Sequence, residues 1–294
     1  MRAFDFWILI LCCVGWAGSF VIAAWALNGT AISPFLLAAV RAVFVLIVMG
    51  VFLFKPLPNG FFRMLIVGLC VGPIHLGLLY TGLETATASG ASILSQALIP
   101  LATLFSVIWL KERVTTAQSL AITGALLGVV IMIYEPNALS LDIGLLYVLG
   151  AYSAMAIGTV IMRRVPDVDW RVYVAWTAVM ILIFCAAMSF LFETDQAKAW
   201  QEDKWPLLIT AAYAAMCVSV FSHGQYFRLI QSYPVNRVVP LTIMITVFAT
   251  LMGVTLLNET LYPRYIIGAV LILPCVWYIA SRGQSDAKPQ KEGE

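Results

Sequence analysis

Arg41 is the residue in this sequence whose chemistry most needs an explanation. It lies eight residues into the apolar run Ser33–Phe54, while Glu84, Glu112 and Glu259 all lie at the ends of such runs. A charge at that depth in a membrane is costly and has to be compensated. The guanidinium can bind a carboxylate through two parallel hydrogen bonds. Alternatively, it can bond backbone carbonyls as a strut between helices, or extend its charge toward water.

Polar side chains follow one face of the fourth apolar run. Ser89, Ser92, Gln96 and Thr103 are spaced for one helical face, and Pro100 interrupts the backbone ladder there. In the ninth run, Thr246 is the middle of three threonines spaced four residues apart. Both stripes can line a central pathway, or they can join helices as hydroxyl groups often do in membranes.

His75 and His223 are the two histidines of the chain. Neither has neighbours at the spacing of metal ligands, so the sequence predicts no metal site. Each can carry a proton within the membrane or serve as a hydrogen-bonded packing residue. His75 could also act as a general base that activates Ser19 or Ser92 as a nucleophile. The chain lacks the hydrolase and protease motifs that would support an enzyme, so we predict none.

Aromatic residues in the deeper parts of the apolar runs can stack on a substrate or fill the core. Together with the polar candidates they give the set of possible substrate-binding residues. These are Arg41, Trp16, Ser19, His75, Tyr80, Ser92, Gln96, Tyr152, Trp176, Tyr213, His223 and Thr246.

The composition requires lipid around most of the chain. Of its 294 residues, 62% are hydrophobic and 11% are charged, whereas a soluble domain carries roughly 25% charge. The net charge of +2 gives no surface for nucleic acid, and six cysteines are too few for a disulfide scaffold. The runs are continuous rather than alternating, which excludes a β-barrel. We therefore predict an all-α polytopic membrane protein without a cofactor.

A membrane-spanning helix needs about 20 apolar residues, and this length divides the chain into ten spans. They are Phe6–Leu27, Ser33–Phe54, Phe61–Gly82, Ala86–Leu110, Thr116–Tyr134, Ile143–Met162, Trp170–Phe192, Trp205–Ile230, Pro234–Leu257 and Pro263–Ser281. Thirteen of the 17 basic residues then lie on one side with both termini, which predicts that this side is cytoplasmic. The polar residues 283–294 are predicted to be a disordered tail.

The two halves of the chain resemble one another. Tyr80 precedes Glu112 by 32 residues, Tyr226 precedes Glu259 by 33, and each Glu closes a long span before a last helix. Because each half has five spans, an odd number, the second half enters the membrane from the other side. We therefore predict inverted repeats over residues 1–134 and 135–282. Such repeats are typical of secondary transporters.

Several local patterns carry a resemblance to a known family. They are Trp16-Ala17-Gly18-Ser19-Phe20, Ser33-Pro34 followed by Arg41, Pro100 before Glu112, Gly128, and Glu259 before Gly268. In this respect the chain resembles the drug/metabolite transporter superfamily in its EamA-like branch. Ala17, Ala121 and Val247 depart from the family pattern.

The resemblance implies export of amino acids or related small metabolites, aromatic amino acids among them, across the bacterial inner membrane. A multidrug or lipid exporter of the same fold is the alternative. The expected partners are a small-molecule substrate and the lipid bilayer, with no nucleic acid. The sequence does not decide between a monomer and a homodimer. It also does not decide between proton-coupled and downhill transport.

Overall fold

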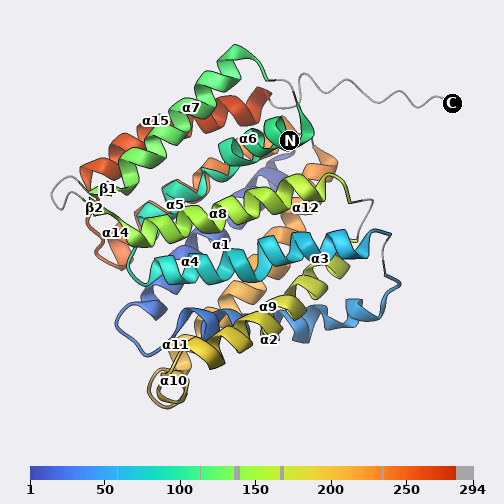
Figure 1. Ribbon diagram of the computed structural model, residues 1–294, viewed down its shortest axis with the longest axis vertical. Coiled ribbons are helices and arrows are strands. Elements are labelled where there is room, and N and C mark those ends of the chain that lie inside the picture. The colour runs from blue at the N-terminus through green and yellow to red at the C-terminus, as the bar shows by residue number, and fades with distance from the viewer. Residues whose placement is uncertain (58, 113, 136–139, 166–168, 234, 283–294) are drawn as a thin grey trace.

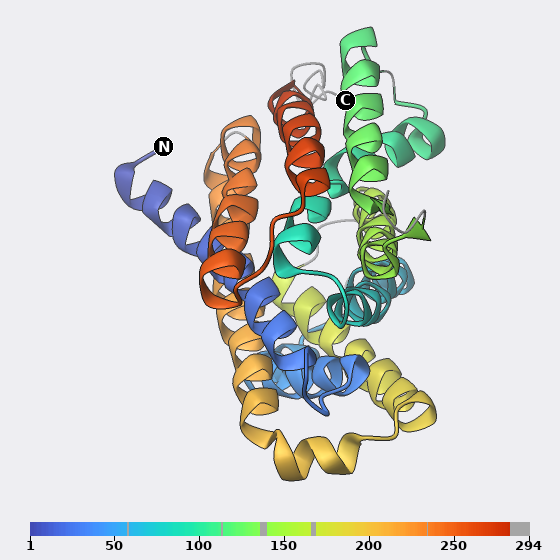
Figure 2. The same cartoon turned by 90° about the vertical axis from the view of Figure 1, so that its left-hand side faces the viewer.

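Ten helices in the described part of the chain are long and apolar enough to cross a membrane, as the sequence predicts. The computed structural model describes residues 1–282 except 58, 113, 136–139, 166–168 and 234. The predicted tail, residues 283–294, and the predicted start of the ninth span at Pro234 therefore lie outside the described residues. The long helices run across the view in Figure 1, and Figure 2 shows some of them end-on and others, such as α7 and α15, along their length.

The first half contains the first five crossings. Its elements are α1 (Ala3–Leu27), α2 (Pro34–Met49), η1 (Gly50–Phe54), α3 (Phe61–Leu69), η2 (Cys70–Ile74), α4 (His75–Leu83), α5 (Ala88–Ser95), α6 (Leu98–Leu110) and α7 (Thr116–Ile133). The short antiparallel pair β1 (Tyr134–Glu135) and β2 (Ser140–Leu141) follows. This pair is the one small departure from an all-helical chain within the described ranges.

The second half contains the other five crossings. Its elements are α8 (Ile143–Met162), α9 (Trp170–Phe192), α10 (Gln196–Glu202), α11 (Lys204–Tyr213), η3 (Ala214–Ser222), α12 (His223–Ser232), α13 (Val235–Val238), η4 (Val239–Ile243), α14 (Met244–Leu256) and α15 (Pro263–Arg282). We call the membrane face that holds Ala3 and Arg282 the terminal face, and the other the opposite face.

Local sequence chemistry explains where several helices begin and break. The side chain of Thr115 accepts from the N–H of Gln118 in a capping box that starts α7, and Asp142 caps α8 through Leu145. Pro100 lacks the N–H that would bond the Gln96 carbonyl, which accepts from Ile99 instead. The fourth crossing is therefore divided into α5 and α6, as the position of Pro100 predicts.

The packing of the helices follows the inverted repeat. Helix α1 packs against α14 and α12, and its counterpart α8 packs against α6 and α4. Three further contacts join equivalent crossings of the two halves: α2 with α9, α5 of the fourth crossing with α14 of the ninth, and α7 with α15. Figures 1 and 2 both show α7 and α15 side by side at one edge of the molecule. Helix α2 also contacts α4 of its own half and η3 of the other half, so residues on these three elements meet between the halves.

Gly128 and Gly268 bring α7 and α15 into close contact. A Cβ on Gly128 would lie 2.8 Å from Cγ1 of Ile272 and 3.1 Å from the carbonyl oxygen of Gly268. We expect Gly128→Ala to lower stability by about 1–3 kcal/mol, because the helix backbones must separate. Thermal unfolding in detergent checks this, with Gly150→Ala as the control, since its nearest atom would lie at 3.5 Å. Equal melting temperatures for the two variants would contradict the close contact.

Charged groups join the ends of α2 and α9 at both faces. At the opposite face, the carboxylate of Glu193 accepts from the N–H groups of Phe35 (2.8 Å) and Leu36 (3.1 Å), at the start of α2. At the terminal face, Nζ of Lys55 lies 2.6 Å from Oδ2 of Asp169, the N-cap of α9. At the opposite face a carboxylate thus lies at the N-terminus of α2, and at the terminal face a carboxylate lies at the N-terminus of α9. The helix dipole favours a negative charge at both places.

The Lys55–Asp169 pair predicts a pH dependence. Partial burial acts to raise the pKa of Asp169, but the hydrogen bonds from Lys55 and Arg171 outweigh it and lower the pKa. The contribution of the pair to stability is therefore complete above the unfolded pKa of about 4 and is lost as the pH falls through the folded pKa. Because both side chains are about one-third or more exposed, we expect a contribution below about 1 kcal/mol.

Asp169→Asn tests this contribution because asparagine retains the N-cap and removes only the charge. We expect a lower melting temperature than that of the native protein at pH 7 and a smaller difference at pH 3. A difference that does not change with pH would show that the charge of Asp169 does not stabilise the fold.

Candidate functional site

Arg41 joins the two halves of the molecule through hydroxyl groups. It is the eighth residue of α2 and is partly buried, with Nη1 donating to the Tyr80 hydroxyl at 2.9 Å and Nη2 to the Ser219 hydroxyl at 3.1 Å. Tyr80 comes from α4 in the first half and Ser219 from η3 in the second. The guanidinium therefore lies at the contact between the repeats.

The positive charge of Arg41 has no carboxylate partner among the residues that the structure describes. In the described part of the chain, none of the ion pairs involves Arg41. Its Nε is buried and has no hydrogen-bond partner there. Because a guanidinium has five N–H donors and only two hydroxyls accept from it, this group can donate further hydrogen bonds to an anion. The arrangement suits recognition of a carboxylate.

His75 and His223 occupy equivalent positions in the two repeats. Each follows immediately after a π-helical segment, η2 in the third crossing and η3 in the eighth. At about 1.5 Å per residue, His75 lies about 12 Å from the opposite face, and His223 lies about 10 Å from the terminal face. In a hydrocarbon core of about 30 Å, the two rings flank the midplane.

Each histidine contacts an aromatic ring of a helix from the other half. The ring of His75 packs edge-on against Tyr152 of α8 (centroids 5.0 Å apart), and that of His223 packs edge-on against Trp16 of α1 (5.5 Å). Trp16 also contacts Tyr226. Helices α1 and α8 are counterparts, so the repeat produces the same aromatic contact twice. Arg41 lies close enough to both histidines for its charge to act on each ring.

The hydrogen bonds of the two imidazoles assign their tautomers. Nδ1 of His75 lies 3.0 Å from the carbonyl oxygen of Ala151, and Nδ1 of His223 lies 2.8 Å from that of Val218. A carbonyl oxygen only accepts, so each Nδ1 carries a hydrogen. Nε2 of a neutral ring is then an acceptor. The two rings thus offer acceptor atoms on either side of the midplane.

A second group of candidate residues forms a closed network between α5 and α14. The Gln96 amide donates to the Thr246 hydroxyl at 3.0 Å, which donates to the Ser92 carbonyl at 3.1 Å. All three residues are buried. No hydrogen bond of the described residues connects this network with Arg41. Its polar groups bond one another, which holds the fourth and ninth crossings together.

Three more candidates contact groups other than Arg41. The Ser19 hydroxyl donates to the Trp16 carbonyl at 2.7 Å, and the Tyr213 hydroxyl donates to the Gly15 carbonyl at 3.2 Å. Trp176 packs edge-on against Phe61, the first residue of α3, and thus lies toward the terminal face. The structure bonds Tyr80 to Arg41 and pairs His75 with Tyr152 and His223 with Trp16. It places Trp176 against Phe61 instead.

Ser219 was not singled out by the sequence analysis. It is a single hydroxyl in an apolar stretch, and only its position four residues before His223 marks it. Within the described ranges, no group of three His, Cys, Asp or Glu side chains could hold a metal ion.

The two repeat glutamates have different partners. The carboxylate of Glu259 accepts from the N–H of Ala88 (2.6 Å), the N–H of Ser89 (3.0 Å) and the Ser89 hydroxyl, at the start of α5. Glu112 instead pairs with Arg163 on the terminal face, at 2.8 Å. The equivalence predicted from the sequence holds for their position after α6 and α14, but not for their contacts.

Comparison with known proteins agrees with this architecture. A solved crystal structure of a 19% identical protein superposes with a TM-score of 0.58 and covers 97% of this chain, which shows the fold. A Salmonella typhimurium protein named "Probable amino-acid metabolite efflux pump" is 25% identical, covering 88% of this chain and 92% of that protein. The Escherichia coli protein of the same name is 23% identical, covering 86% and 90%.

A chloroplast protein of Arabidopsis thaliana, described as WAT1-related, is 26% identical and covers 84% of this chain and 62% of that protein. The model of the EamA-like transporter family matches residues 4–134 and 142–281, which are nearly the whole chain in two repeats. The chain belongs to the EamA-like transporter family.

Proposed function

We propose that this protein is a secondary transporter that exports amino acids or related small metabolites, and that Arg41 binds the substrate carboxylate. The observation that carries the proposal is the partly buried guanidinium, bonded only to the hydroxyls of Tyr80 and Ser219 and without an acidic partner among the described residues. Two relatives are named amino-acid metabolite efflux pumps. Every α-amino acid supplies the carboxylate that such a site binds.

The location of Arg41 supports alternating access as the mechanism. Its two hydroxyl partners belong to different repeats, so rocking of one half against the other would change both contacts. A substrate carboxylate that displaces the hydroxyls would couple its own binding to that movement. Differential contacts of this kind are what a ligand needs to shift a conformational equilibrium.

The histidines complete the proposed site. No hydrogen bond to Nε2 of His75 or His223 occurs among the described residues, so each neutral ring offers an acceptor to the ammonium group of an amino acid. Trp16 and Tyr226 next to His223 offer ring faces and edges to an apolar or aromatic substrate side chain. The site therefore has separate partners for the carboxylate, the ammonium group and the side chain.

The basic residues of the chain gather on one side of the membrane. Thirteen of the 17 basic residues fall on the terminal face when the chain is threaded through ten spans, and from the positive-inside rule we propose that this face lies in the cytoplasm. We propose the inner membrane as the location, and we propose transport without covalent chemistry, since the site offers recognition groups rather than an activated nucleophile.

Counterflow in proteoliposomes tests the proposal. Vesicles containing the purified chain and preloaded with one unlabelled amino acid should transiently accumulate the same labelled amino acid from outside, whereas protein-free vesicles should not. A panel of amino acids identifies the substrate. Folded protein that produces no counterflow with any amino acid or related carboxylate would contradict the proposed function.

A further inference from the structure

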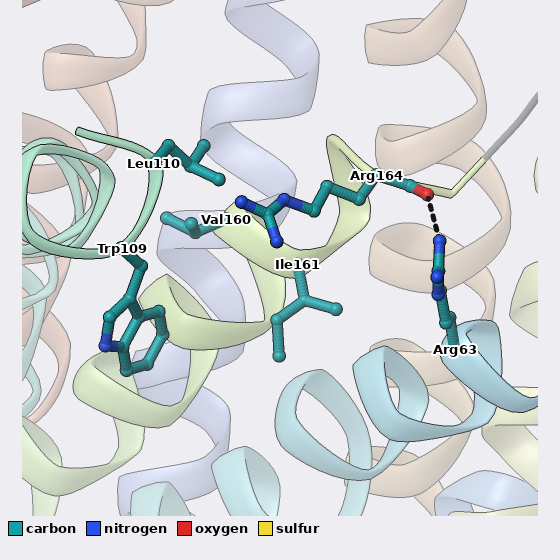
Figure 3. A pocket seen from close by; sticks show the side chains of 6 residues that line it. All are labelled: Arg63, Trp109, Leu110, Val160, Ile161 and Arg164. Carbon is teal, nitrogen blue, oxygen red and sulfur yellow. Dashed lines mark hydrogen bonds between the residues drawn. The ribbon is translucent and has the colours of Figure 1, made fainter. Parts of the chain in front are cut away.

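Two arginines and a tryptophan surround a hollow at the terminal face, away from Arg41. The hollow has a volume of about 310 Å³ and is lined by Arg63 of α3, Trp109 and Leu110 of α6, and Val160, Ile161 and Arg164 at the end of α8. Figure 3 shows Arg164 extending across the middle of the hollow toward Leu110, with Trp109 and Arg63 on opposite sides. The hollow therefore combines cations with an apolar floor.

Neither arginine is paired with a carboxylate of the described residues. In the part of the chain that the structure describes, the side chains of Arg63 and Arg164 form no ion pair, and Arg63 bonds only the Arg164 carbonyl, at 3.5 Å. The neighbouring acid Glu112 is already bound by Arg163 through both of its oxygens, at 2.8 and 3.0 Å. Two guanidiniums are therefore available to an anion from outside the chain.

The position of the hollow selects the kind of anion. It lies where α3, α6 and α8 reach the membrane surface, and Trp109 is 48% exposed there, as expected for a residue at the level of the lipid headgroups. A phosphate bound by both arginines would place its attached acyl chains next to the apolar surfaces of Leu110, Val160 and Ile161. Basic pockets between membrane helices bind anionic lipids in this way.

The inverted repeat supplies an internal comparison. A hollow of about 320 Å³ at the opposite face lies between the equivalent ends of α1 and α14, and its lining includes Trp25, Asn28 and Glu259. This second hollow has a tryptophan and a similar volume, but its lining contains no arginine or lysine, and its carboxylate bonds the start of α5. The two hollows thus share the equivalent ends of α8 and α1 and of α6 and α14, and of the two only the hollow at the terminal face is lined by arginines.

We propose that Arg63 and Arg164 form a binding site for the headgroup of an anionic phospholipid, with Trp109 at the lipid surface. The bound headgroup would join the ends of α3 and α8, which both contribute arginines, to α6. This site is separate from the transport site, and its occupancy does not depend on which substrate the protein carries.

Binding of phosphatidylglycerol to the purified full chain tests this proposal. Native mass spectrometry measures the apparent affinity for phosphatidylglycerol and for phosphatidylcholine with the same acyl chains. We expect stronger binding of phosphatidylglycerol and about tenfold weaker binding by Arg63→Gln/Arg164→Gln. The control Arg2→Gln/Arg171→Gln removes the same charge from the same face, at exposed residues outside the hollow, and should bind like the native protein.

Three results would overturn the proposal. They are equal affinity for the two lipids, equal weakening by the two double variants, and full competition by inorganic phosphate, which would make the hollow a site for free anions. The single variant Arg164→Gln repeats the test if the double variant does not fold. It should weaken binding of phosphatidylglycerol severalfold, and unchanged binding would contradict the site.

Discussion

Replacing Arg41 with glutamine is expected to reduce transport about 100-fold without lowering the melting temperature. The variant loses the charged hydrogen bonds to the substrate carboxylate, which are worth about 3 kcal/mol, and each 1.4 kcal/mol is a factor of ten. Stability should not fall, because a charge inside the membrane is costly to the fold and glutamine still bonds hydroxyl groups. Initial rates of counterflow at equal amounts of reconstituted protein measure the loss.

Arg41→Lys is the matched variant for this prediction. It keeps the positive charge but lacks the planar group that binds both carboxylate oxygens, so we expect a loss of about tenfold. Normal transport by Arg41→Gln would assign Arg41 a structural role. A large fall in melting temperature together with the loss of transport would likewise indicate a strut between α2, α4 and η3.

Replacing Glu259 with glutamine should destabilise the protein by about 2–4 kcal/mol. The carboxylate accepts three hydrogen bonds at the start of α5, from Ala88 and Ser89. Such bonds to a charged group are among the strongest in proteins, and an amide would bring a donor toward these donors. The Glu259 carboxylate packs against Gly253, where a Cβ would collide with it.

Glu112→Gln is the control that the repeat itself provides. Glu112 is the counterpart of Glu259, but its side chain is 46% exposed and pairs with Arg163 at the surface, so its loss should cost less than about 1 kcal/mol. Thermal unfolding in detergent compares the two variants. Equal melting temperatures would contradict the different roles that the structure gives the two glutamates.

The sequence predicts the ten crossings and the inverted repeat because both depend on patterns along the chain. Apolar runs of membrane-spanning length mark the helices, and the spacing from Tyr80 to Glu112 and from Tyr226 to Glu259 reveals the repeat. The division of the fourth crossing is also predictable, since Pro100 removes a backbone donor. The short pair of strands between α7 and α8 is not, because two residues per strand produce no pattern.

The equivalence of His75 and His223 could not be predicted from the tyrosine-to-glutamate spacing that reveals the repeat. His75 precedes Tyr80 by five residues, whereas His223 precedes Tyr226 by three, so the histidines do not align when the tyrosines do. The structure relates them through the π-helical segments that each follows. Their ring partners Tyr152 and Trp16 lie on distant parts of the chain, so these contacts leave no local signal.

The polar stripes show the limit of periodicity for predicting a site. Ser92, Gln96 and Thr246 lie on helix faces as their spacing indicates, yet these faces meet each other and their polar groups form a closed network. Periodicity gives the face of a helix but not the helix that packs against it. Contact of these residues with substrate stays a prediction, and so does that of Ser19, Tyr213 and Trp176.

The most direct test of the account compares a substrate acid with its neutral amide. Both are measured as competitors of counterflow, in the native protein and in Arg41→Gln, with the amino acid that gives counterflow as the labelled substrate. If Arg41 binds the carboxylate, the amide should compete about 100-fold more weakly than the acid in the native protein, and the two should compete equally in the variant. The same preference for the acid in both proteins would show that another group binds the carboxylate.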